Sequence, residues 1–357
     1  MKKIMCLFTA FLISSCVFFE IPAQEPTGEV LNITPVPELT VISTNINKII
    51  ALQCETYLET AWGNQPEQWG YSEDKARRFS LLPLVFKSEN EIYFSDFANL
   101  RILKYNGVDK EPMQAIYLTP FFPDDYVYSW TSNPQPPVSL ISVSQDKIYV
   151  PYGYNQIGIL SLNGEILNDI AIPDYYYNFS FPSTQDVAWV DREGNLYVFS
   201  NTKFVVFKRG WENLEWVKTK APITRYFWKE YAVQGPVDLI SSSNINVYEK
   251  DSSGSFSQIY SISIDTGAKS GFFPMFGVDN NGNAYVSVIS KNTNEHIYSR
   301  YSLLTGEKHL GSIAYPYAGR YTTLIPSVSP NGTIYFIAYN SEDLSIGPKI
   351  IKCNFPS

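Results

Sequence analysis

Two aspartates and two histidines come nearest to catalytic chemistry in this chain. Asp186 and Asp238 each stand close to the start of an expected inner β-strand, where two carboxylates could act as acid and base or hold calcium. His296 and His309 are the only histidines, so a multi-histidine metal centre is excluded and a Ser-His-Asp triad has poor support. Because such aspartates more often cap a strand or bond to a neighbouring segment, both are weak catalytic candidates, and the one cofactor they leave open is a divalent cation.

Tyrosine and tryptophan recur in segments that should be loops, each time shortly after a proline. Loops are ordinarily polar, so repeated aromatic loops call for a reason. One reading is a rim that stacks on sugar rings, peptide side chains or another protein, with arginines to orient the ligand. The other reading is that these rings plug a channel or pack between β-sheets. The expected ligand-binding residues are Tyr126, Trp130, Tyr175, Tyr176, Tyr177, Arg225, Tyr226, Trp228, Tyr317, Arg320 and Tyr321.

The elements that position these residues should be β-strands. The 357 residues include 26 Tyr, 22 Phe and 7 Trp against 4 Met, and this composition suits a pleated sheet better than helices. Only 17% of the residues are charged, which is too few for a coiled coil, and 45% are hydrophobic, which is too many for a disordered chain. The net charge of -8 makes nucleic acid an unsuitable partner.

One β-rich unit recurs along the chain at intervals of 39 to 56 residues. Each copy has an apolar strand, a tight turn with Gly or Asn, a second strand that usually carries a tyrosine, and two further strands. This spacing is typical of propeller repeats. The sequence therefore predicts an all-β, six-bladed β-propeller with four-stranded antiparallel blades. The copies are centred on residues 91–94, 147–150, 195–198, 244–247, 283–286 and 333–336.

The first copy resembles an NHL-type repeat, while the other copies lack its Asp, Asn and Arg. This resemblance implies the propeller fold over roughly residues 45 to 355. The motif residues are Tyr93, Asp96, Asn99, Arg101, Ile102, Tyr105 and Gly107.

The two ends of the chain should meet in the last blade. The final copy reaches its third strand at 349–354 and lacks a fourth, which would leave an open strand edge. The β-rich segment 46–58 can supply the missing outermost strand. Cys54 and Cys353 would then lie in partner strands, and an oxidising compartment would join them as a disulfide. The alternative is two unrelated buried thiols.

The first residues have the layout of an export signal. Lys2 and Lys3 precede an apolar run that ends at Ser14-Ser15-Cys16 and is too short to span a bilayer. This ending resembles the lipobox of bacterial lipoproteins, in which the cysteine is lipidated. An ordinary signal peptide cut near Ala23, giving a secreted or periplasmic soluble protein, is the alternative. The expected organisation is a signal peptide (1–15), the lipidated Cys16 with a proline-containing tether (16–44) and the propeller domain (45–357).

These features favour a membrane-anchored, non-enzymatic propeller of the cell envelope. We expect a monomer that binds a glycan, a peptide or an envelope protein through its aromatic loops and touches the membrane only through its lipid. The runner-up is a lactonase-like or glycosidase-like hydrolase, or a lyase, that uses Asp186 and Asp238 with a divalent ion.

Overall fold

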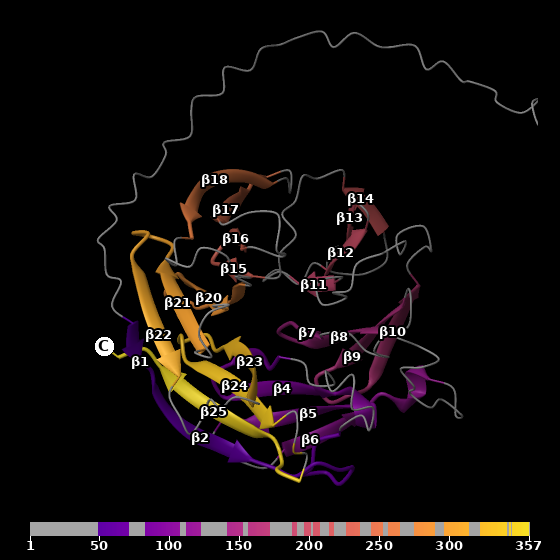
Figure 1. Cartoon of the computed structure of the whole chain (residues 1–357). Helices are drawn as coiled ribbons and strands as arrows, with labels where there is room; N and C mark the ends of the chain where they lie inside the picture. Colours follow the sequence, from indigo (N-terminus) through magenta and orange to yellow (C-terminus); the bar gives the residue numbers. More distant parts are fainter. Residues whose placement is uncertain are drawn as a thin grey trace, which may run out of the picture. The chain divides into compact units, whose positions relative to one another are not determined.

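The described residues form an all-β propeller. In this computed structural model the strands follow one another from indigo to yellow along the chain (Figure 1). Two short 3-10 helices, η1 (Phe97–Asn99) and η2 (Thr119–Phe121), accompany the strands, and no helix in the described part is long and apolar enough to cross a membrane. The structure describes residues 49–70, 83–107, 112–122, 141–152, 156–171, 188–190, 196–200, 203–207, 214–217, 226–235, 244–252, 256–264, 275–289, 296–313, 322–340, 343 and 345–356.

Five sheets have four strands each, and all their neighbouring strands are antiparallel. This confirms the expected blade type. The first sheet contains β3 (Val85–Ser88), β4 (Glu91–Asp96), β5 (Arg101–Asn106) and β6 (Pro112–Tyr117). The second contains β7 (Ser142–Val143), β8 (Lys147–Tyr152), β9 (Gln156–Ser161) and β10 (Ile166–Ala171). The third contains β11 (Ala188–Val190), β12 (Leu196–Ser200), β13 (Lys203–Phe207) and β14 (Leu214–Val217). The fourth contains β15 (Phe227–Trp228), β16 (Tyr231–Gln234), β17 (Asn244–Lys250) and β18 (Phe256–Ser263). The fifth contains β23 (Thr322–Val328), β24 (Ile334–Asn340), β25 (Lys349–Asn354) and β2 (Gln53–Glu59).

The expectation of six four-stranded blades is wrong, because five sheets have four strands and the remaining one has five. That sheet runs β19 (Met275–Val278), β20 (Asn283–Ile289), β21 (His296–Ser302), β22 (Lys308–Ile313) and β1 (Ile49–Ala51). β1 lies parallel to β22 and covers an edge that would otherwise be open. The segment expected as one strand therefore divides at Leu52, which is buried and donates its N–H to Ser312 O at 2.9 Å.

The chain ends meet in one sheet, as predicted. β2 pairs antiparallel with β25, and Figure 1 shows this indigo strand beside the yellow C-terminal one. Cys54 and Cys353 face each other in the ladder and form a disulfide that spans 299 positions of sequence. The N-terminal strand thus closes the last blade.

The fourth sheet departs from the predicted repeat phase. Residues 244–247 were expected in a second strand, but they lie in β17, the third strand of the sheet. The second strand is β16, which begins at Tyr231. The sequence misleads here because Asn246 takes the place of the usual tyrosine, and the connection between β16 and β17 is longer than a hairpin turn.

The repeated tyrosines owe their recurrence to packing between sheets. Tyr93, Tyr149, Tyr285 and Tyr335 are all at most 4% exposed. Tyr93 packs against apolar side chains of β8 and β9, and Tyr335 packs against the β3–β6 sheet. The hydroxyl of Tyr285 shares its one hydrogen between Asp279 Oδ2, 2.9 Å away beside its own sheet, and Gly332 O, 3.2 Å away in a turn of the next sheet. Tyr93, Tyr285 and Tyr335 thus pack one blade against its neighbour.

The hairpins that carry these tyrosines are held by local hydrogen bonds. At 279–283 the Asp279 carboxylate accepts the N–H of Asn283 at 2.9 Å, and Gly282 has φ of 80°. At 329–333 a matching turn places Gly332 at φ of 90°. Because both glycines lie in the left-handed region, other side chains would strain these turns.

Candidate functional site

The first strands of several sheets surround a cavity of about 240 Å³. Residues of β3, β7, β19 and β23 line it, together with Tyr226, which stands directly before β15. Each of these four strands lies at the end of its sheet in the strand order, so it is paired on one side only. Four sheets thus contribute their terminal strands to the described lining.

The described residues of the lining carry no charged side chain. Their polar side chains are Ser142, Tyr226, Asn280 and Ser327, and the rest are apolar or proline. Ser327 is 2% exposed, and its Oγ accepts the backbone N–H of Leu84 at 2.8 Å. Within the described part of the chain its hydroxyl hydrogen has no acceptor. The cavity thus offers neutral hydrogen-bonding groups and one buried hydroxyl donor.

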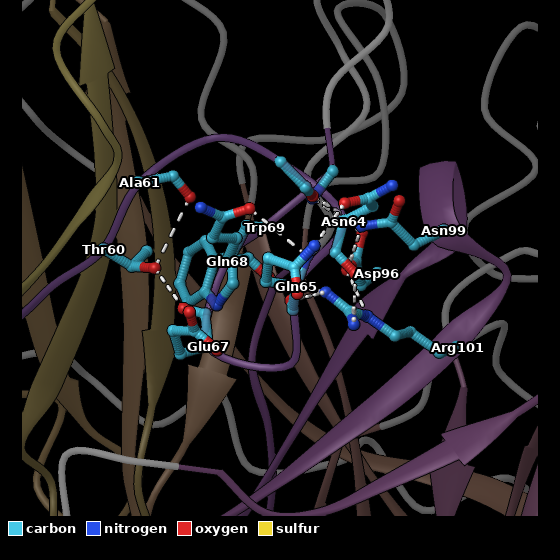
Figure 2. Close-up of polar contacts among 12 residues, drawn as sticks. Thr60, Ala61, Asn64, Gln65, Glu67, Gln68, Trp69, Asp96, Asn99 and Arg101 are labelled. Carbon is cyan, nitrogen blue, oxygen red and sulfur yellow. Dashed lines mark hydrogen bonds and ion pairs between the residues drawn. The ribbon is translucent and has the colours of Figure 1, made fainter.

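The NHL-type motif forms a buried polar cluster beside the chain segment 60–70. The Arg101 Nε donates to Asp96 Oδ2 at 2.8 Å, and both side chains are 1% exposed. Asn99 and the N–H of Gly70 also donate to the Asp96 carboxylate, at 2.8 and 3.0 Å. Figure 2 shows Asp96, Asn99 and Arg101 close together beside Asn64 and Gln65 of this segment. Burial raises the pKa of the Asp96 carboxyl, and its Asn99, Arg101 and Gly70 partners oppose the rise.

Arg101 ties this loop to the first blade. Its two terminal nitrogens donate to the carbonyls of Asn64, Gln65 and Gln68 at 3.3, 2.9 and 2.6 Å (Figure 2). Trp69 is fully buried in the same place, stacks on Phe94 and donates its Nε1–H to a tyrosine hydroxyl at 2.8 Å. Because every strong donor and acceptor of the ion pair has a partner, the motif has a structural role: it holds residues 64–70 against the first blade.

A second charged cluster lies on the same blade. The Glu91 carboxylate accepts from Lys104 Nζ at 2.8 Å, Lys87 Nζ at 3.1 Å and the hydroxyl of Tyr93 at 2.6 Å. Burial by itself would raise the pKa of Glu91, but these donors outweigh it and lower the pKa to about 2. This cluster stabilises the blade and takes no part in lining the cavity.

Among the predicted ligand-binding residues, the structure describes Tyr226 and Trp228. Tyr226 lines the cavity, and its hydroxyl donates to Met275 O at 3.3 Å. Trp228 was expected in a loop, but it lies in β15, is 5% exposed and packs into the core shared with the strands β19, β20 and β21. Trp228 therefore packs between sheets, which was the alternative to a ligand-binding rim. The residues outside the described ranges are Tyr126, Trp130, Tyr175, Tyr176, Tyr177, Arg225, Tyr317, Arg320 and Tyr321.

The catalytic candidates also fall outside the described residues. Both Asp186 and Asp238, predicted near the starts of inner strands, lie in segments that the structure does not describe, so their placement stays a prediction. His309 lies on β22, where Nε2 is 3.3 Å from Glu307 Oε1. In the described part of the chain no group of three His, Cys, Asp or Glu side chains gathers as a metal site would require.

Sequence reasoning missed the side chains that line the cavity. Ser327 and Asn280 flank the ends of first strands, next to the predicted turns. Their position could have identified them, because in a propeller the first strand of each blade lies nearest the centre, whatever its residue types. The connections that were expected to carry aromatic rings join these strands to the preceding sheets, because 123–140 leads to Ile141 and 314–321 leads to β23.

Comparison with known proteins supports the fold alone. No family model matches the chain, and no curated protein matches it. A solved structure named luciferin-regenerating enzyme is similar with a TM-score of 0.50 and 14% identity, covering 85% of this chain and 96% of its own. A "Putative exported protein" from Bacteroides fragilis NCTC 9343 is similar with a TM-score of 0.50 and 12% identity, covering 88% of this chain and 98% of its own. At such low identity, these similarities place the chain among β-propellers without assigning it an activity.

Proposed function

We propose that this protein is an extracytoplasmic β-propeller that binds a glycan, a peptide or an envelope protein through its aromatic segments and its cavity. The observation that carries the proposal is the cavity between β3, β7, β19 and β23, whose described lining residues are uncharged. Concave sites with a few convergent polar groups are where proteins usually bind ligands. Among the predicted ligand-binding residues, Tyr226 lines this cavity, which connects the predicted aromatic set with it.

The location outside the cytoplasm is supported by the Cys54–Cys353 disulfide. The name of the Bacteroides fragilis protein, which includes the word exported, is in keeping with it. The lipobox-like sequence ending at Cys16 adds a lipid anchor to the proposal. In the native host, replacing Cys16 with alanine should move the protein from the membrane fraction to the soluble fraction. Retention of the Cys16→Ala protein in the membrane would remove the anchor from the account.

Binding is tested with the mature chain, its disulfide intact, on an array of envelope glycans and peptides. Tyr176→Ala and Tyr321→Ala should each weaken the observed binding, because aromatic rings supply much of the contact energy at such sites. The matched control is Tyr117→Ala, since Tyr117 is 55% exposed on the outer strand β6. Binding that is absent throughout, or equal in all three variants, would contradict the proposed loop site.

A further inference from the structure

The cavity is too small for a large ligand. Its volume of about 240 Å³ lies below the roughly 300–1,000 Å³ of pockets that enclose a complete drug-sized molecule. A single ring with its substituents is the largest group that the space suggests. If the loops bind a polymer, only one unit of it would enter the cavity.

The lining selects against charge. With no cation or anion among the described lining residues, a charged group would lose its hydration without gaining an ion pair. The chain also carries a net charge of -8, which disfavours acidic ligands at long range. A neutral occupant avoids both costs.

The lining also selects for hydrogen bonding. Within the described residues the cavity is lined by the polar side chains of Ser142, Tyr226, Asn280 and Ser327, and Ser327 offers a hydroxyl hydrogen at a site that is 2% exposed. An aliphatic side chain would leave these groups without partners, and each buried unpaired group costs free energy. Sugar hydroxyls both donate and accept, so one sugar ring can satisfy donors and acceptors together.

From the size, neutrality and hydrogen-bonding groups of this cavity, we infer that it binds one uncharged sugar unit, the end of a neutral glycan. The inference rests on the proposed binding function and narrows it to one ligand class. Ser327 donates its hydroxyl hydrogen to the sugar while it continues to accept the Leu84 N–H.

The test is calorimetric titration of the mature protein with methyl glycosides of glucose, galactose, mannose and N-acetylglucosamine, each up to about 10 mM. Methyl glucuronide and methyl galacturonide are the charged counterparts of two of these probes. At least one neutral glycoside should bind, and its acidic counterpart or a neutral tripeptide should not. Failure of all four neutral glycosides, or equal binding of a uronide, would overturn the inference.

Substitutions of cavity-lining residues test whether the sugar binds in the cavity. Ser327→Ala should weaken the neutral glycoside by about 2- to 12-fold, the range expected for one hydrogen bond. The matched control is Ser299→Ala, because Ser299 is a buried serine on β21 that bonds to Val286 O and lies outside the lining. Val143→Trp should fill the space and abolish binding, and Asn280→Trp repeats this test from an exposed turn if the first variant does not fold.

The outcomes separate this inference from the proposed function. A glycan that loses affinity in Tyr176→Ala or Tyr321→Ala, yet binds equally to Ser327→Ala and Val143→Trp, would keep the loop site and overturn the sugar cavity. A neutral methyl glycoside whose binding is blocked by Val143→Trp, with no effect of the loop variants on any polymer, would support the cavity and contradict the loop site.

Discussion

Removing the disulfide should lower stability while leaving the fold intact. Cys54 and Cys353 close a loop of 299 positions, for which the chain-entropy model gives about 5.7 kcal/mol as an upper value at 25 °C. Because denatured chains retain some structure, we expect the Cys54→Ala/Cys353→Ala variant to lose about 2–5 kcal/mol. The β2–β25 ladder, from Gln53 to Glu59, remains to hold the native blade together.

Urea unfolding followed by tryptophan fluorescence and circular dichroism measures this loss. The native spectrum of the double variant should match that of the parent protein. Reducing agent should destabilise the parent and leave the variant unchanged, which separates the disulfide from other effects of the reagent. A loss below about 1 kcal/mol would show that joining the chain ends does not restrict the unfolded chain as argued.

Three further changes test the packing and the charges. Arg101→Met should cost about 3–5 kcal/mol, because it leaves the buried Asp96 carboxylate unpaired, and Arg101→Met/Asp96→Leu should recover part of that loss in the same unfolding assay. Glu91→Gln should cost about 1 kcal/mol above pH 4.5, and this difference should shrink as the pH falls toward 2, because the native pKa of Glu91 lies below its unfolded value; a difference that is constant from pH 7 to pH 2 would refute the assigned ion pairs. Trp228→Ala should cost about 3–5 kcal/mol of stability through its core position, and it should leave ligand affinity unchanged at temperatures where the variant is folded.

The propeller fold could be predicted from the sequence because the residues that recur in each copy are those that pack between neighbouring sheets. A tyrosine must fill the space between neighbouring sheets, so Tyr93, Tyr149, Tyr285 and Tyr335 recur at blade-length intervals. Because an open strand edge is unfavourable, the N-terminal segment was predicted to pair with the C-terminal strand. The positions of Cys54 and Cys353 supported this pairing, and the two residues form a disulfide.

Two features of the fold escaped this reasoning for physical reasons. The extra strand β1 is three residues long and pairs in parallel with a strand far away in sequence, so local patterns carry no signal for it. In the fourth sheet, Asn246 occupies a third-strand position within an apolar run, and the run was mistaken for the missing tyrosine strand. Hydrophobic periodicity identifies a strand but does not number it within a sheet.

The candidate site was only partly readable. Aromatic residues near an expected loop can belong to a binding rim or to the core, and composition does not distinguish the two. Tyr226 lies at the cavity while Trp228, two positions later, is buried between sheets, although both belong to the same hydrophobic cluster. Ser327 escaped notice because a single serine in an apolar strand has no distinctive spacing.

Hydrogen–deuterium exchange of the mature protein, with and without the neutral methyl glycoside that binds best, tests the central claim most directly. The account predicts that the sugar protects amides of the first strands β3, β7, β19 and β23, and that Val143→Trp removes this protection. Protection that is confined to the outermost strands β6, β10 and β18, or that persists in Val143→Trp, would contradict a binding site at the centre of the propeller.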